Sequence, residues 1–548
     1  MPLEHEAQVE LPGTLQLFTA TRDEHTSKVI LSEDIILDPT PTSSPNDPLN
    51  WSLPRKYWHA ALALFYTAFT AATSNDAGSA SDELDSLLNI DYNVQNTAAG
   101  VLFIGIGYWT LLAAPMPVLY GRRLQYFICL IFSIIGAVWF ARQANVEDAV
   151  WNQLFVGASE ACAEALVQQS LSDLFFQHQR GSVLGMYILA TSIGTFLGPL
   201  VGGYIASWKW QWVGWSSAII SGVTLVVFYF GFEETTFHRE VFLGRCLTNG
   251  SNRRAVETNN AESKLSETDK AARQESTVSP SQDGEGPYDP PKTYWQRIAI
   301  ITPAPNLIGL GIKQYFERLY RTLHVFTFPA VLYAGLQWGA QDAWLSFYLT
   351  VEENNWYDPP WNYSDAAVSI MNVPTLIGAV IGCFYGGWFS DVFVRWMAKR
   401  RGGLSEAEDR LWLMIPSAII NPAGMMLFGI GSSKGWPWPG PYIGLAMIGF
   451  GWGCAGDLSM AYLVDCYPDM VLEGMVGVAV INNSLASIFT FVASDWIDAS
   501  GIGGTFVATG VLGCFFQFLV IPMIIYGKSF RRSTLTRYKK FLYLRDGR

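Results

Sequence analysis

The chain has 548 residues, half of them hydrophobic and 15% charged, and a formal net charge of −12 at pH 7. Its apolar residues form twelve stretches of about 18–26 residues, which excludes a soluble globular protein. They predict transmembrane helices, because backbone N–H and C=O groups find hydrogen-bond partners in hydrocarbon only within such regular structure. The acidic charge comes largely from the first fifty residues and from loops expected outside, so it does not indicate a nucleic-acid partner.

The distribution of basic residues gives the expected orientation. In chain order, the expected spans are 57–76, 96–117, 124–141, 151–172, 183–206, 211–232, 326–350, 367–390, 411–431, 440–464, 472–494 and 504–527. Of the 35 Lys and Arg residues, 32 lie in the segments on one side of these spans. The positive-inside rule therefore places both termini in the cytosol, and we expect a multi-pass protein of the plasma membrane.

The lengths of the connections divide the chain into five parts. These are a cytosolic N-terminal tail (1–56), a six-span half (57–232), a cytosolic linker (233–325), a second six-span half (326–527) and a basic cytosolic tail (528–548). Residues 250–290 have the composition of a disordered segment, whereas 304–323 mixes apolar and basic residues and predicts an interfacial helix. No signal peptide is expected, because residues 1–49 are polar and acidic.

Three further patterns bear on modification and chemistry. Asn362 begins an Asn-Tyr-Ser sequon in an outer loop, so we expect it to be glycosylated. The seven Cys show no paired spacing and the six His are scattered, which predicts no metal site and no cofactor. Nucleotide-binding loops and paired catalytic residues are also missing from the sequence, which disfavours an enzyme or an ATP-driven pump.

The fifth span carries a pattern of small residues: Gly185, Gly194, Gly198, Pro199, Gly202 and Gly203. Glycines at these spacings expose bare backbone, so a neighbouring helix can approach closely. Pro199 removes a backbone hydrogen bond and allows a bend.

These residues match the antiporter motif of the twelve-span drug:proton antiporter branch of the major facilitator superfamily at every fixed position. The chain resembles a fungal member of that branch, in the subgroup that contains polyamine and organic-cation transporters. Similar strings begin at Asp47 before the first span, at Asp173 after the fourth and at Glu408 before the ninth. The resemblance covers about residues 48–540. It implies an all-α membrane fold with twelve transmembrane helices in two pseudo-symmetric six-helix halves.

The resemblance also points to two gating loops, formed by Gly121, Arg122 and Arg123 after the second span and by Asp391 and Arg395 after the eighth. Relatives carry an acid three residues before Gly121, where this chain has Val118. We therefore expect one of two state-locking contacts to be weak or replaced. Many proton-coupled relatives have Arg where this chain has Gln153, so a proton step through that Arg is not expected.

Acids without a basic partner remain inside the spans. The residues expected to couple protons to substrate are Glu160, Glu164, Asp342 and Asp457. A charged side chain at bilayer depth costs about 2.5–3.5 kcal/mol on insertion scales, so each acid is expected to face a cavity rather than lipid. An alternative is a structural hydrogen bond to a neighbouring helix. The residues expected to bind substrate are Gln168, Gln337, Trp338, Trp452, Asn482 and Asn483, and the Trp rings are suited to stacking on a cation.

The sequence therefore predicts a secondary active transporter that works by alternating access, with two halves rocking about a central site. The expected activity is proton-coupled antiport that exports a drug, a secondary metabolite or an organic cation. One alternative is an uptake carrier for polyamines or other cations. A second is a nutrient sensor that signals through the long linker. We expect a monomer in the lipid bilayer, with a small-molecule substrate and protons as its ligands.

Overall fold

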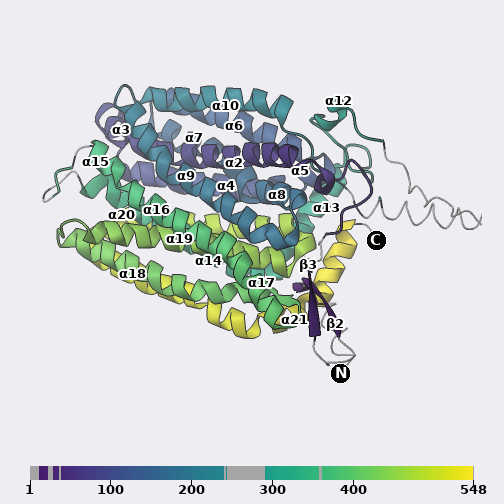
Figure 1. The fold of residues 1–548 in the computed structure, drawn as a ribbon. Coiled ribbons are helices and arrows are strands. Elements are labelled where there is room, and N and C mark those ends of the chain that lie inside the picture. The colour runs from purple at the N-terminus through teal and green to yellow at the C-terminus, as the bar shows by residue number, and fades with distance from the viewer. Residues whose placement is uncertain are drawn as a thin grey trace, which may run out of the picture.

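The computed structural model describes residues 11–22, 29–35, 39–237, 239, 242, 290–356, 359, 361–363 and 365–546. Long helices run side by side in one bundle (Figure 1). The helices coloured purple to teal belong to the first half of the chain, and those coloured green to yellow belong to the second half (Figure 1). The two halves therefore form two adjacent layers, as expected for a fold of two six-helix halves.

The first half contains six long helical segments. They are α2 (Leu53–Asn75), α4 (Tyr92–Ala113), α6 (Arg122–Ala141), α7 (Val146–Cys162) with α8 (Gln168–Leu174), α9 (Arg180–Ala206) and α10 (Gln211–Gly231). Between α7 and α8 the helix continues through a π-helical turn, Ala163–Val167. Two short helices, α3 (Ser81–Leu88) and α5 (Met116–Leu119), lie in the connections.

The second half repeats this plan. Its helices are α14 (Pro329–Asn355), α15 (Asp365–Ile370), α16 (Asn372–Phe384) with α17 (Ser390–Arg400), α18 (Met414–Ser433), α19 (Gly440–Cys466), α20 (Val471–Phe518) and α21 (Val520–Asp546). A second π-helical turn, Tyr385–Phe389, joins α16 to α17. At Gly501 the backbone leaves the helical region, with φ 66° and ψ 163°, and this kink separates the two spans expected at 472–494 and 504–527.

Eight helical stretches within the described residues are long and apolar enough to cross a membrane, and one of them, Pro468–Arg545, includes two of the expected spans. The other three expected spans, 57–76, 151–172 and 326–350, fall on α2, on α7 with α8, and on α14. These helices form as predicted but are less apolar, because they carry polar side chains that line a central cavity.

The N-terminal tail contains strands that the sequence did not suggest. Strand β1 (Thr14–Gln16) pairs antiparallel with β4 (Leu404–Glu406), in the loop that follows α17, so that Thr14 faces Glu406. Strands β2 (Phe18–Arg22) and β3 (Val29–Ile35) form a separate hairpin. The tail is thus attached to the second half of the molecule.

Charged side chains hold β1 in place. Arg531 in α21 donates hydrogen bonds to the carbonyl of Pro12 at 2.6 Å and to Glu406 at 2.8 Å. Burial alone would raise the pKa of Glu406, but hydrogen bonds from Lys528, Arg531 and Thr14 lower it overall. The tail, β4 and α21 therefore form one ionic cluster on the side expected to face the cytosol.

The described end of the linker runs along the first half. It contains α12 (Tyr294–Arg297) and α13 (Ile312–Thr322), and it is bonded to the loop after α4 by Thr302 N to Tyr120 O at 2.8 Å. The apolar side chains of α13 and the residues before it are exposed: Ile308, Leu310, Ile312, Phe316 and Tyr320. This agrees with an interfacial helix, although α13 is shorter than the expected 304–323. Of residues 250–290, expected to be disordered, all but Pro290 lie outside the described part.

Candidate functional site

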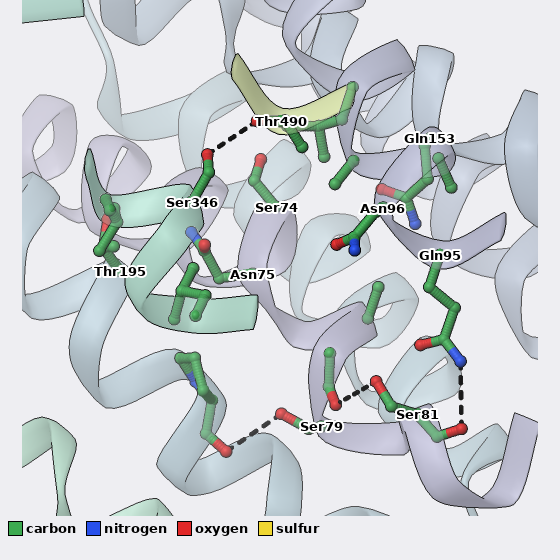
Figure 2. A pocket seen from close by; sticks show the side chains of 18 of the residues that line it. Ser74, Asn75, Ser79, Ser81, Gln95, Asn96, Gln153, Thr195, Ser346 and Thr490 are labelled. Carbon is green, nitrogen blue, oxygen red and sulfur yellow. Dashed lines mark hydrogen bonds between the residues drawn. The ribbon is translucent and has the colours of Figure 1, made fainter. Parts of the chain in front are cut away.

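A cavity of about 250 Å³ lies between the two halves. Residues from α2, α4, α7, α9, α14, α19 and α20 line it. It also reaches Ser79, Ser81, Gln143 and Ser207, in the connections on the side expected outside. Figure 2 shows polar side chains from several helices along its wall, among them Ser74, Asn75, Asn96, Gln153 and Thr195. The cavity is therefore a polar space in an apolar bundle, reached from the outer side.

Three of the four predicted coupling acids line this cavity. Glu160 and Glu164 come from the fourth span, and Asp342 comes from α14 in the other half. Glu160 accepts a hydrogen bond from the Ser74 hydroxyl, and Asp342 accepts one from Trp452 Nε1 at 3.3 Å. Both glutamates are only 7% exposed. Among the described residues that line the cavity there is no Lys, Arg or His, so the carboxyl groups meet no basic side chain there.

Two tryptophans form an aromatic wall beside these acids. The rings of Trp338 and Trp452 have centroids 4.6 Å apart and planes tilted by 52°. Phe196 meets the edge of Trp452 at 5.7 Å between centroids. Both tryptophans line the cavity and both are nearly fully buried, so they are not the interfacial anchors that aromatic residues near helix ends often are.

The amides predicted to bind substrate fall in different places. Asn483 lines the cavity, but Gln168, Gln337 and Asn482 do not. Gln337 donates to the carbonyl of Phe516 at 2.6 Å, and Gln168 donates to the carbonyl of Glu164 at 3.0 Å. Two of these amides are therefore bonded to backbone, that of Gln337 to the neighbouring helix α20 and that of Gln168 to the preceding turn of its own helix. Asn482 is buried near Glu164 and Asp342, behind the cavity wall.

The sequence missed several polar residues of the cavity wall. Ser74, Asn96, Ser346 and Thr490 line it, and the Thr490 hydroxyl bonds to that of Ser346 at 2.8 Å. Single polar side chains are common in transmembrane helices, so only Ser74 and Ser346 had a signal, the low apolar content of α2 and α14. Gln153, which stands where many relatives have Arg, also lines the cavity.

The fourth predicted acid, Asp457, lies outside the cavity. It is fully buried in α19 beside Gly185 of α9, on the path between the cavity and the gating loops. Pro199 and Gly203 of the pattern line the cavity, whereas Gly194, Gly198 and Gly202 pack on the first half. A Cβ on Gly194 would lie 2.2 Å from the carbonyl oxygen of Ala68, and one on Gly198 would lie 2.8 Å from the Cα of Ala72. These distances agree with the close helix approach inferred from the spacing.

The gating loop after α17 joins the two halves. Asp391 accepts hydrogen bonds from the backbone N–H and the hydroxyl of Ser182, at the start of α9, each at 2.7 Å. Arg410 pairs with Asp391 at 2.8 Å and with Asp465 at 2.6 Å. Burial alone would lower the pKa of Arg410, but these carboxylates more than offset it and raise the pKa. Arg395 bonds the carbonyl of Asp391 at 3.1 Å.

The gating loop after α4 is held differently. Arg122 pairs with Asp173, at the end of the fourth span, and the backbone N–H of Arg123 donates to Glu234 at 3.2 Å. Gly121 has φ 90° and packs against Thr302 of the linker. The linker therefore contacts this loop. In relatives, an acid at the position of Val118 would form a contact here. Asn362 of the predicted glycosylation sequon is exposed in the loop before α15.

Residues 59–491 match the model of the Major Facilitator Superfamily. The chain is 49% identical to an uncharacterized MFS-type transporter of Schizosaccharomyces pombe, over 98% of this chain and 95% of that protein. It is 48% identical to Protein HOL1 of Saccharomyces cerevisiae, over 98% of both chains. The solved structure of the proton:xylose symporter XylE aligns with a TM-score of 0.56 at 13% identity, covering 86% of this chain and 97% of that one.

Proposed function

The chain belongs to the major facilitator superfamily and is a multi-pass secondary transporter of the membrane, and we propose that it exports a small organic cation in exchange for protons. The observation that supports this best is the charge of the central cavity. Glu160, Glu164 and Asp342 enter it from both halves, and no described Lys, Arg or His lines it. A site with negative charge alone favours a cationic ligand.

The energetics support a functional role for these acids. Each acid in the bilayer interior costs about 2.5–3.5 kcal/mol on insertion scales, a cost that apolar side chains of similar size would avoid. A bound cation or a proton neutralises the carboxylates and offsets this cost. Competition between the two for the same carboxyl groups gives exchange, because a proton leaves when a cation arrives.

The aromatic wall supports an organic cation rather than a metal ion. Trp338 and Trp452 line the cavity together with Asp342, which accepts a hydrogen bond from Trp452 Nε1, and a cation over a Trp face gains about 0.5–2 kcal/mol. The cavity volume of about 250 Å³ fits a small or slender molecule. Aliphatic amines and amphipathic ammonium compounds meet both requirements. Export of a drug or secondary metabolite of this kind is the working form of the proposal.

The direction of transport follows from gradients, because alternating access is reversible. The same acid-lined cavity would serve uptake of polyamines or other cations if the membrane potential drove them inward. We place the protein in the plasma membrane as a monomer with both termini in the cytosol. The concentration of 32 of 35 Lys and Arg residues on one side supports that orientation.

Transport in proteoliposomes tests the proposal. Radiolabelled spermidine flux is measured with and without an imposed pH gradient for the intact protein, for Glu164→Gln and for Glu147→Gln. Glu147 is an exposed acid in the first turn of α7, so it is a matched control outside the cavity. We expect flux that depends on the pH gradient, loss of that flux in Glu164→Gln and no change in Glu147→Gln.

Two results would contradict the proposal. Spermidine flux that ignores the pH gradient would exclude proton exchange. Flux of an uncharged amphipathic compound without any flux of spermidine would exclude the cation and leave neutral drugs or metabolites as the substrates.

A further inference from the structure

The two halves carry acids at equivalent places in their fourth helices. Asp173 and Asp465 mark the ends of these helices, and each pairs with an Arg, Asp173 with Arg122 and Asp465 with Arg410. Glu164 lies nine residues before Asp173, whereas Asp457 lies eight residues before Asp465. The π-helical turn at Ala163–Val167 inserts one residue into the first helix and removes this difference. Glu164 and Asp457 are therefore counterparts.

The surroundings of the two counterparts differ. Glu164 lines the central cavity, but Asp457 does not. Asp457 is 0% exposed, and neither of its carboxyl oxygens has a hydrogen-bond partner within the described part of the chain. Bare backbone surrounds it instead. A Cβ on Gly185 would lie 2.8 Å from Asp457 Oδ2, and one on Gly387 would lie 3.0 Å from the same oxygen.

These glycines belong to different halves. Gly185 is in α9, whereas Gly386 and Gly387 are in the π-helical turn after α16. We call this contact of Gly185 with Gly386 and Gly387 around Asp457 the glycine seam. It lies between the cavity and the Asp391–Ser182 contact, so it must separate when the cytosolic side opens.

Few titratable groups face Asp457. The charged groups that act on it are Arg410 and Asp391, and these two are already paired with each other. The thiols of Cys383, at the end of α16, and of Cys454, one turn earlier on α19, are the other titratable neighbours. Around the adjacent Gly456, the side chains from α9 and α14 are Ile188 and Trp338, which do not titrate.

We propose that Asp457 is a proton-binding site, separate from the substrate cavity, whose protonation favours the closed glycine seam. A carboxylate without a hydrogen-bond donor is costly in a dry contact, whereas a neutral carboxyl group fits there. When the halves part on the cytosolic side, water reaches Asp457 and it releases its proton to the cytosol. The inference rests on the proposed proton-coupled function and adds where one of the protons binds.

Amide hydrogen exchange on the intact protein in lipid nanodiscs tests this proposal. Exchange of residues 180–188 and 383–392 is compared at about pH 5.5 and about pH 8, after correction for the intrinsic effect of pH. In the unmodified protein we expect protection of both segments to fall by about tenfold or more at the higher pH, as expected for one titrating group. Asp457→Asn, which is permanently neutral, should stay at the protected level at both pH values.

Two further variants keep the test falsifiable if Asp457→Asn does not fold. Gly185→Ala adds a methyl group 2.8 Å from Asp457 Oδ2, so it should hold the seam open and remove protection at both pH values. Asp342→Asn, in the cavity, should retain the pH response. A pH response that persists in Asp457→Asn, or that is absent from the unmodified protein, would overturn the proposal.

The outcome is independent of substrate identity. If spermidine is not transported but Asp457→Asn abolishes the pH response, the cation proposal fails and the proton site stands. If spermidine is exchanged for protons and the seam does not respond to pH, the function stands and the site of proton binding lies elsewhere.

Discussion

Asp391 in the second half and Ser182 in the first are joined by two hydrogen bonds of 2.7 Å, one from the backbone N–H of Ser182 and one from its hydroxyl. The carboxylate thereby meets the positive end of α9, where helix dipoles favour negative charge. Arg410 holds the same carboxylate from the other side at 2.8 Å. This contact joins the halves on the side expected to face the cytosol, while the cavity reaches the connections on the opposite side.

Replacing Asp391 by Asn should weaken that contact. Loss of the charge removes a hydrogen-bonded ionic partner worth about 1.5–3 kcal/mol and leaves Arg410 with Asp465 alone. Cys466, buried beside Asp465, serves as a native reporter. We expect maleimide labelling of Cys466 to accelerate in Asp391→Asn and to stay unchanged in Asp498→Asn, which alters an exposed acid. Equal labelling in both variants would mean that this contact does not hold the halves together.

Two glycine substitutions should change stability in opposite directions, one at the tight contact of α9 with α2 and one in the open surroundings of α10. Gly194→Ala places a methyl group 2.2 Å from the carbonyl oxygen of Ala68, so the helices must separate at a cost of about 1–3 kcal/mol. Gly222→Ala in α10 meets nothing within 4 Å and should stabilise its helix by about 0.5–1 kcal/mol. Thermal unfolding in the same detergent measures both. A Gly194→Ala protein that melts no lower than the unmodified one would contradict the close packing.

The aromatic wall predicts a graded loss of cation affinity. Trp338→Leu removes one of the two ring faces and should weaken binding of an organic cation by about 0.5–2 kcal/mol, or roughly two- to thirtyfold. Trp452→Phe keeps a ring but loses the hydrogen bond to Asp342, so its effect should be smaller. Competition of unlabelled cations against radiolabelled spermidine gives both affinities. If the substitutions weakened the binding of neutral competitors as much as that of cations, the rings would contribute to the shape of the site and not to the recognition of positive charge.

The attachment of the N-terminal tail should depend on pH. The lowered pKa of Glu406 means that its ion pairs stabilise the docked tail fully above the pKa of an undocked Glu, 4.5, and that this stabilisation disappears as the pH falls through the docked pKa. Exchange of amides in residues 11–18 should therefore rise in acid. Glu406→Gln should show weakened docking at neutral pH and little further change on acidification. A tail that stays equally protected at about pH 4 would exclude this ionic attachment.

Removal of residues 243–289 distinguishes a transporter from a sensor. The described ends of this part meet at one place, because Arg239 pairs with Asp47 at 3.1 Å and Asn46 bonds both Pro290 and Lys292 at 2.9 Å. A short Gly-Ser connection can therefore replace the segment without pulling the halves apart. We expect unchanged flux in proteoliposomes. Intact flux with lost signalling in cells would support an additional sensor role, and lost flux would contradict the prediction.

The helices could be predicted well because each one is determined by residues within its own stretch of sequence. Apolar stretches of membrane length and basic flanks define each span, and even α2 and α14, with their polar faces, were recognised from sequence. Helix rotation was not available from sequence. Gln337 and Trp338 are adjacent, yet Trp338 lines the cavity and Gln337 bonds backbone behind it. The same limitation hid the different surroundings of Glu164 and Asp457.

The strands of the tail could not be predicted for another reason. Thr14 bonds Glu406 across 392 residues of sequence, and no local pattern announces a pairing of that range. This pairing constrains the order in which parts of the protein fold. Residues 11–18 leave the ribosome long before Glu406 and Arg531, which bind them. They must therefore wait until the helices of both halves have been synthesised before they dock.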